Sequence, residues 1–204
     1  MEVRLRRHLQ PKLIEFFDEK LKDDPEVQSA FKSQNVSYLK RLTVKTASTL
    51  VGIHEIGNNH GTIVELIQKT CGGKPGDPYC MFTVQSVIAY VELKMNVVSS
   101  LWASGSCADV RVHTPILMWV KGIPGPGSIV IWKHDNGKGH TGIVVDANEK
   151  TFHAVEGNTS ASTSELDAVT REGQGFHFTK RAISGGPNMK VMGFIEPFWD
   201  KYAK

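Results

Sequence analysis

The segment around which the chain is organised covers residues 76–92 and reads Gly76-Asp77-Pro78-Tyr79-Cys80-Met81-Phe82-Thr83-Val84-Gln85-Ser86-Val87-Ile88-Ala89-Tyr90-Val91-Glu92. Its apolar residues recur at helical spacing, which predicts a helix of about three turns. The turn-forming residues before it put Cys80 at or near the helix N-terminus. Unpaired N–H groups and the helix dipole favour a thiolate there, and the thiolate is the nucleophilic form of cysteine. A buried cysteine at the start of a core helix is the alternative interpretation.

Length and composition indicate an ordinary globular protein of one domain, with or without an appendage. The chain has 204 residues, 40% of them hydrophobic, and a net charge of +3. The basic residues are scattered and not interleaved with aromatic ones, so we expect no nucleic-acid partner. No apolar run reaches the length of a membrane span. The first residues lack the apolar centre of a signal peptide, so we expect synthesis in the cytoplasm. We also expect the protein to be a monomer.

The first part of the chain follows helical patterns. Residues 1–36 are predicted to form an accessory helical segment, and their apolar stripe consists of Leu13, Ile14, Phe17 and Leu21. A second helix is expected from its cap Ser37 to Ile53. Shorter helical segments are expected at residues 62–69, 101–102 and 115–120.

From Ser128 the pattern changes to short strands rich in β-branched and aromatic residues. They are expected at residues 128–132, 141–146, 151–155, 176–181 and 191–195. Helices followed by strands of this kind predict an α+β fold, in which N-terminal helices pack on an antiparallel sheet of five to six strands.

A catalytic cysteine needs a base, and the base needs a group that orients it. His140 opens a predicted strand, and the hairpin after it turns around Asn148. Glu156 lies as far beyond Asn148 as His140 lies before it, so we expect the two to face each other with Cβ atoms about 5 Å apart. Asn158 is a second group that could orient the ring.

We expect neither a metal ion nor a cofactor. His54 and His60 are six residues apart, whereas the two histidines of a zinc-protease helix are four apart. The other histidines lack partners at the spacing of metal ligands. Cys71 and Cys107 are interpreted as structural, and an odd number of cysteines argues against a disulfide framework.

Three motifs in this order resemble the signatures of the CHAP family, the cysteine- and histidine-dependent amidohydrolases/peptidases. They are Pro78-Tyr79-Cys80, Gly139-His140-Thr141-Gly142-Ile143-Val144 and Val155-Glu156-Gly157-Asn158-Thr159. The similarity extends from Gly52 to Pro197. Members of this family have a papain-like fold and cut peptidoglycan. The resemblance implies Cys80 as nucleophile, His140 as base, Glu156 as orienter and Asn158 as an auxiliary fourth residue.

The resemblance also implies the function and the partner. Residues 37–204 would be a CHAP-like catalytic domain that cleaves an amide or peptide bond of bacterial peptidoglycan, as a phage endolysin does after its release from the host cytoplasm. Some phage members bind calcium through an aspartate run before the cysteine, but this chain has only Asp77 there, so no metal is carried over. The alternative is a non-catalytic wall-binding or phage-particle protein that keeps the fold.

Overall fold

The computed structural model describes residues 7–160 and 173–198. Residues 1–6, 161–172 and 199–204 lie outside this description; they include the start of the predicted N-terminal segment and the end of the predicted catalytic domain. The described α-helices are α1 (Pro11–Leu21), α2 (Pro25–Ser33), α3 (Leu39–Ser48), α4 (Thr62–Gln68), α5 (Cys80–Met95) and α6 (Cys107–His113). Three short 3₁₀ helices are η1 (Val36–Tyr38), η2 (Lys69–Cys71) and η3 (Ile116–Met118). The strands are β1 (Ile129–His134), β2 (Gly139–Ala147), β3 (Thr151–Thr159), β4 (Gly175–Ala182) and β5 (Met189–Ile195).

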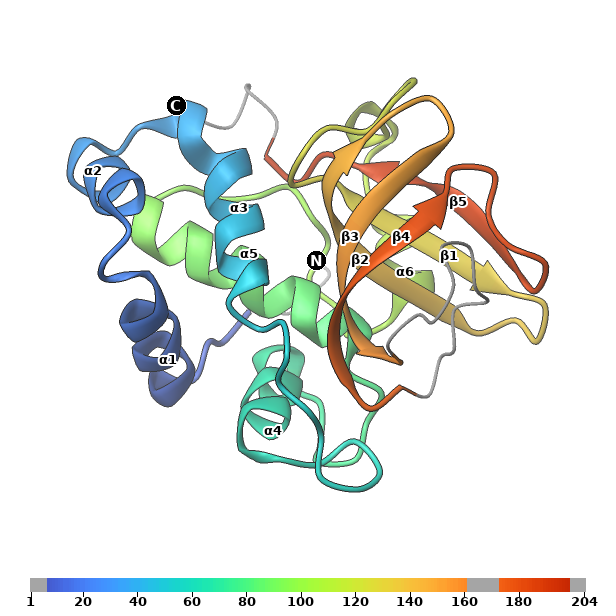
Figure 1. Ribbon diagram of the computed structural model, residues 1–204, viewed down its shortest axis with the longest axis horizontal. Coiled ribbons are helices and arrows are strands. Elements are labelled where there is room, and N and C mark those ends of the chain that lie inside the picture. The colour runs from blue at the N-terminus through green and yellow to red at the C-terminus, as the bar shows by residue number, and fades with distance from the viewer. Residues whose placement is uncertain (1–6, 161–172, 199–204) are drawn as a thin grey trace, which may run out of the picture.

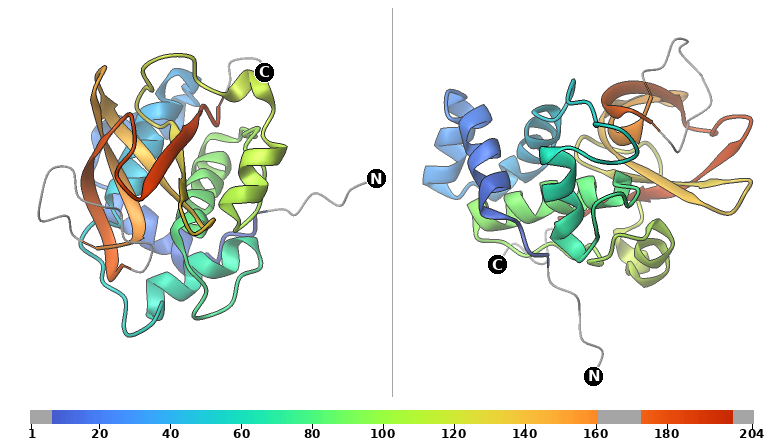
Figure 2. Two further views of the ribbon diagram at one scale, coloured as in Figure 1. Left: turned by 90° about the vertical axis from the view of Figure 1, so that its right-hand side faces the viewer. Right: turned by 90° about the horizontal axis from the view of Figure 1, so that it is seen from below.

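The helices α3 and α5 both contact β2 and β3 of the sheet. Helices α1, α2 and α3 gather on one side of α5, and the N-terminal end of α5 points toward the strands (Figure 1). Seen from below, α1 and α2 lie at one end of the molecule and the strands at the other, with α6 on the side of the strands (Figure 2, right). The sheet has the order β4-β3-β2-β1-β5, and every neighbouring pair is antiparallel. The predicted α+β class and antiparallel sheet are thus confirmed, and the described sheet has five strands where five to six were expected.

The central helix begins at Cys80, as the sequence predicted. Every residue from Cys80 to Val91 is buried, so the helix is covered on all sides, as is usual for a core helix. It ends at Met95, where Asn96 takes a left-handed conformation with φ 49° and its N–H bonds to Glu92. This burial fixes the position of Cys80 relative to the sheet.

The predicted N-terminal helical segment forms two helices, α1 and α2. Each begins with a proline in its first turn, and the Asp24 carboxylate accepts from the N–H groups of Glu26 and Val27 to cap α2. Three residues of the predicted apolar stripe are fully or almost fully buried in the main core: Leu13, Phe17 and Leu21. The body of the protein therefore covers the stripe.

The second helix differs from its prediction at both ends. Asn35, not Ser37, supplies the cap, because its side chain accepts from the Ser37 N–H at 3.1 Å and leads into η1. The helix α3 then ends at Ser48 rather than Ile53. The chain turns there to reach the sheet: Gly52 has φ +86°, and its N–H bonds to the Phe176 carbonyl at 3.0 Å.

Two short helices between α5 and the sheet were predicted wrongly. No helical turn forms at residues 101–102, and a helix not expected from the sequence, α6, follows with its cap at Ser106. Only η3 forms within residues 115–120. The chain is extended after it because Trp119 pairs with Ile195 and the Met118 carbonyl accepts from the Glu196 N–H.

The two faces of the sheet bury different clusters. One face packs on the helices and carries Ile129, Ile131, Ile143, Val155, Phe176 and Ile195. The other carries Val130, Trp132, Val144, Phe152, Ala154 and Phe194. Since side chains alternate along a strand, His140 and Glu156 share the second face.

No helix in the described residues is long and apolar enough to cross a membrane.

Candidate active site

Cys80 is the first residue of α5, and Tyr79 precedes it in a non-helical conformation. The Met81 N–H donates to the sulfur, which favours the charged form of the thiol. Thr83, one turn on, packs so closely on β3 that a Cβ at Gly157 would lie 2.4 Å from its hydroxyl. The missing side chain at Gly157 thus lets the start of α5 approach the strand that carries Glu156.

His140 and Glu156 form a buried hydrogen-bonded pair. The ring Nε2 lies 2.9 Å from Glu156 Oε2, and both side chains are fully buried. Because Nε2 is bonded to Glu156, Nδ1 is the ring nitrogen that could exchange a proton with the Cys80 thiol. Nδ1 has no hydrogen bond of ordinary geometry to the described residues, but Cys80 and His140 lie close enough that each shifts the pKa of the other. Catalytic hydrogen bonds are often loose before substrate binds.

The strand register differs from the one predicted for this pair. Ile143 pairs with Val155, so Glu156 lies beside Gly142 rather than opposite His140. A Cβ at Gly142 would lie 2.8 Å from Glu156 Cγ. The glycine leaves room for the carboxylate to cross diagonally to His140, which is on the same face of β2. The hairpin was expected to be centred on Asn148, but Ala147 pairs with Phe152, so its centre lies between Glu149 and Lys150; a bulge between Val144 and Asp146 then moves the register back by one residue.

Two residues of β4 that the sequence analysis did not single out hold the Glu156 carboxylate. Arg181 donates from Nε to Oε1 at 2.8 Å and from Nη2 to Oε2 at 3.1 Å. The Thr179 hydroxyl donates to Oε1. Alternation along β4 indicates that Thr179 and Arg181 share a face, but no local pattern shows that this face meets Glu156.

Cys107 lies next to the reactive thiol. Cys107 is the first residue of α6. A Cβ added at Gly139 would lie 2.5 Å from the Cβ of Cys107, so this residue packs directly on the start of β2. A hydrogen bond with Cys107 lowers the pKa of Cys80, burial raises it, and the hydrogen bond and charge of His140 lower it again. The result is a Cys80 pKa well below the ordinary value of a thiol. Cys107 therefore helps to set the charge of the thiol, which the sequence did not indicate.

The base and its orienter are both charged at neutral pH. Burial lowers the pKa of His140, but its interactions with Cys80 and Glu156 have a larger, opposite effect and raise the pKa to about 9. Burial raises the pKa of Glu156, and His140 together with Arg181 reverses this, to about 2. The site can therefore hold a thiolate beside an imidazolium.

Cys80 is almost completely buried, with only 5% of the residue exposed. Asn158, predicted to help orient the ring, lies at a bulge of β3 with φ 58°. Its buried side-chain amide makes no hydrogen bond to the described residues. Trp132 pairs with His140 across the strands, and its ring stacks on the imidazole with centroids 5.4 Å apart.

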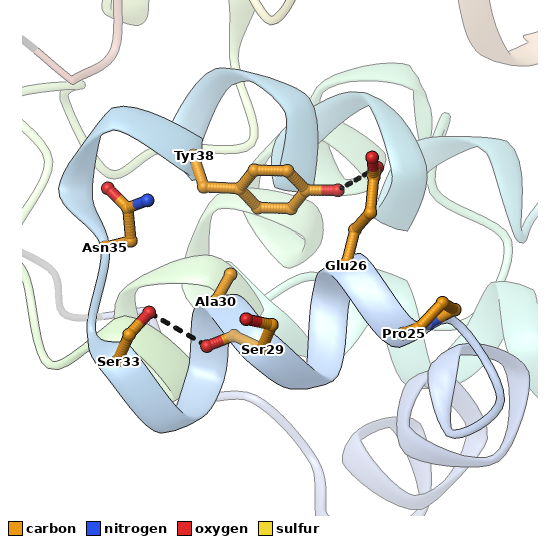
Figure 3. Close-up of a pocket in the computed structure, with 7 residues that line it drawn as sticks. All are labelled: Pro25, Glu26, Ser29, Ala30, Ser33, Asn35 and Tyr38. Atoms are coloured by element: carbon orange, nitrogen blue, oxygen red, sulfur yellow. Dashed lines mark hydrogen bonds between the residues drawn. The ribbon is translucent and has the colours of Figure 1, made fainter.

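No group of three or more His, Cys, Asp and Glu side chains suited to a metal ion occurs within residues 7–160 and 173–198. A surface hollow lies far from Cys80, beside α2 and η1 (Figure 3). Its Tyr38 hydroxyl donates to Glu26 at 2.9 Å. Next to it, the Gln34 side chain bonds to the Lys94 carbonyl, near the C-terminal end of α5. The hollow is thus at the opposite end of this helix from the thiol.

Comparison of the sequence with models of known protein families gave no match, and a search of curated proteins gave none either. The function proposed below therefore depends on the geometry of the described residues and on the three motifs.

Proposed function

We propose that the protein is a cysteine-dependent peptidoglycan hydrolase of papain-like CHAP fold. The observation that carries this proposal is that Cys80, at the start of α5, adjoins a His140 ring whose far nitrogen is bonded to Glu156. Nucleophile, base and orienter in this relation are the parts of a triad. The resemblance of the three motifs to those of the CHAP family supports the substrate class.

The proposed reaction is acyl transfer to the thiol and then to water. The Cys80 thiolate attacks an amide carbonyl, and the tetrahedral intermediate collapses as the His140 imidazolium gives its proton to the leaving amine. The neutral ring then takes a proton from water, whose oxygen attacks the thioester. Collapse of this second intermediate releases a carboxylic acid, and the thiolate–imidazolium pair forms again.

The start of α5 supplies part of the electrostatic stabilisation. The first N–H groups of a helix have no partner within it and carry partial positive charge. The Cys80 N–H is one of them, and we assign it as a donor to the oxyanion of both intermediates.

The test uses purified peptidoglycan with the wild-type protein and the Cys80→Ser variant. The wild type should release soluble fragments with new amine and carboxyl ends, and mass spectrometry of these fragments identifies the bond. Cys80→Ser should fold normally by circular dichroism and release nothing. Release by Cys80→Ser above a few per cent of the wild-type rate contradicts the proposal. A wild-type protein that sediments with the wall but releases nothing is instead a binding protein.

A further inference from the structure

The carboxylate that orients His140 is itself held by a buried arginine. Arg181 is 5% exposed and Glu156 fully buried, and the guanidinium contacts both carboxylate oxygens. Arg181 pairs with Phe152 in the strand register, whereas Glu156 pairs with His177. The arginine side chain therefore runs back along the sheet to reach the carboxylate.

All the acceptor positions of Glu156 are used. Oε1 receives the Thr179 hydroxyl and Arg181 Nε, while Oε2 receives Arg181 Nη2 and His140 Nε2. An ionised carboxylate has about four such positions. A rotation of the carboxylate that moves Oε2 away from His140 would also break the paired bonds to Arg181.

The arginine also balances charge. A thiolate at Cys80 and an imidazolium at His140 cancel, so Glu156 alone would leave one buried negative charge. Burying an uncompensated charge is costly. Arg181 restores neutrality, so that the nucleophile and the orienter can both stay ionised.

We propose that Arg181 is a positioning residue of the active site, which fixes the Glu156 carboxylate toward His140 Nε2 and keeps the buried site neutral. This inference rests on the proposed function because it assigns Arg181 to the same site. Its first measurement needs no substrate, so the two can fail separately.

The charge balance is tested by titrating the His140 ring by NMR, with the signal assigned by its loss in His140→Ala. Arg181→Met removes a nearby cation, so the midpoint should move to higher pH by about one unit or more, as expected for a charge several ångström away at an effective dielectric constant of about 20. Glu156→Gln removes an anion, and its midpoint should move to lower pH. Lys180→Met loses the same charge from the neighbouring position on the other face of β4, and should leave the midpoint in place.

The orientation is tested with Arg181→Lys, which keeps the charge but not the two-pronged contact. Its midpoint should stay at the wild-type value, while kcat on peptidoglycan falls several-fold. In Arg181→Met, kcat/KM should fall on the order of 10²-fold, as for a misplaced catalytic group.

A purely structural arginine would behave differently. A folded Arg181→Met protein with an unchanged His140 midpoint would overturn the charge balance. An Arg181→Lys protein with wild-type kcat would overturn the orientation, and this variant decides the matter if Arg181→Met does not fold. If the wild type does not hydrolyse peptidoglycan, the proposed function fails, and the titration still shows whether Arg181 sets the charge of the His140 ring.

Discussion

The protein contains two arginine–glutamate pairs, one partly buried and one buried, whose neighbours differ. Arg7 bonds to Glu92 at 3.0 Å in the second half of α5, and Arg181 bonds to Glu156 at 2.8 Å in the sheet. The first pair is 8% and 17% exposed, the second 5% and 0%. Bond type is thus similar, while burial and neighbours differ.

The hydrogen-bond partners of the first pair are amide and carbonyl groups that do not titrate, although both charges also act on the pKa of the nearby Cys71 thiol. Glu92 also accepts from the Ser99 N–H at 2.7 Å, and Arg7 also donates to Gln85 at 2.6 Å and to the Leu101 carbonyl at 2.5 Å. This pair joins the N-terminal segment, α5 and the following loop. The second pair shares its carboxylate with His140.

The largest effect on the rate of hydrolysis is expected at His140, which shares the carboxylate of the second pair. His140→Ala should lower the rate of hydrolysis by about 10³-fold or more, because both the base and the partner that keeps Cys80 ionised are lost. The double variant with Cys80→Ala should be no slower than either single variant, since the members of a triad act as a unit. Rates on purified peptidoglycan decide this, and losses that multiply in the double variant would mean that the two residues act separately.

A smaller effect is expected at Cys107. Its hydrogen bond lowers the pKa of Cys80, so Cys107→Ala should raise that pKa and slow the alkylation of Cys80 by iodoacetamide several-fold at neutral pH. Peptide mass spectrometry across a pH series measures the midpoint. Cys71→Ala is the control, because burial raises the pKa of Cys71 to about 11 and it is not a cause of the Cys80 shift. Equal midpoints in both variants would contradict the role of Cys107.

The smallest effect on activity is expected at the other pair. Arg7→Met should destabilise the protein by about 1–3 kcal/mol, the cost of leaving partly buried acceptors without their donor, as measured by denaturant unfolding. The rate of hydrolysis and the His140 titration midpoint should both stay at their wild-type values. A shifted midpoint in Arg7→Met would show that the two pairs are coupled through α5, and the comparison would then fail.

The sequence predicted those parts of the fold that depend on local patterns. The strands follow from their β-branched runs, and the start of α5 follows from the turn residues before Cys80. The helix α6 was missed because it is short and follows a segment rich in small residues. The signal for its start was a serine, Ser106, followed three residues later by an acidic residue, Asp109. In the structure the Asp109 N–H donates to the Ser106 hydroxyl at 3.3 Å.

The candidate site was predictable in part for the same reason. Cys80, His140 and Glu156 lie in motifs, and the structure brings all three together. The register of β2 and β3 was not predictable, because it depends on a bulge and on the space left by Gly142. Arg181 could not be predicted either, since its contact with Glu156 is made only when β4 pairs with β3.

The position of β4 at the edge of the sheet has a consequence for folding. Arg181 is separated from Glu156 by 25 residues, and Glu156 from His140 by 16. Contacts between distant segments form late, because the chain must first close the loops between them. The full set of charges around Cys80 therefore exists only after β4 has docked on β3. Until then the Glu156 carboxylate lacks the cation that balances its charge and holds it in place, so the orienter of His140 is complete only once β4 is paired.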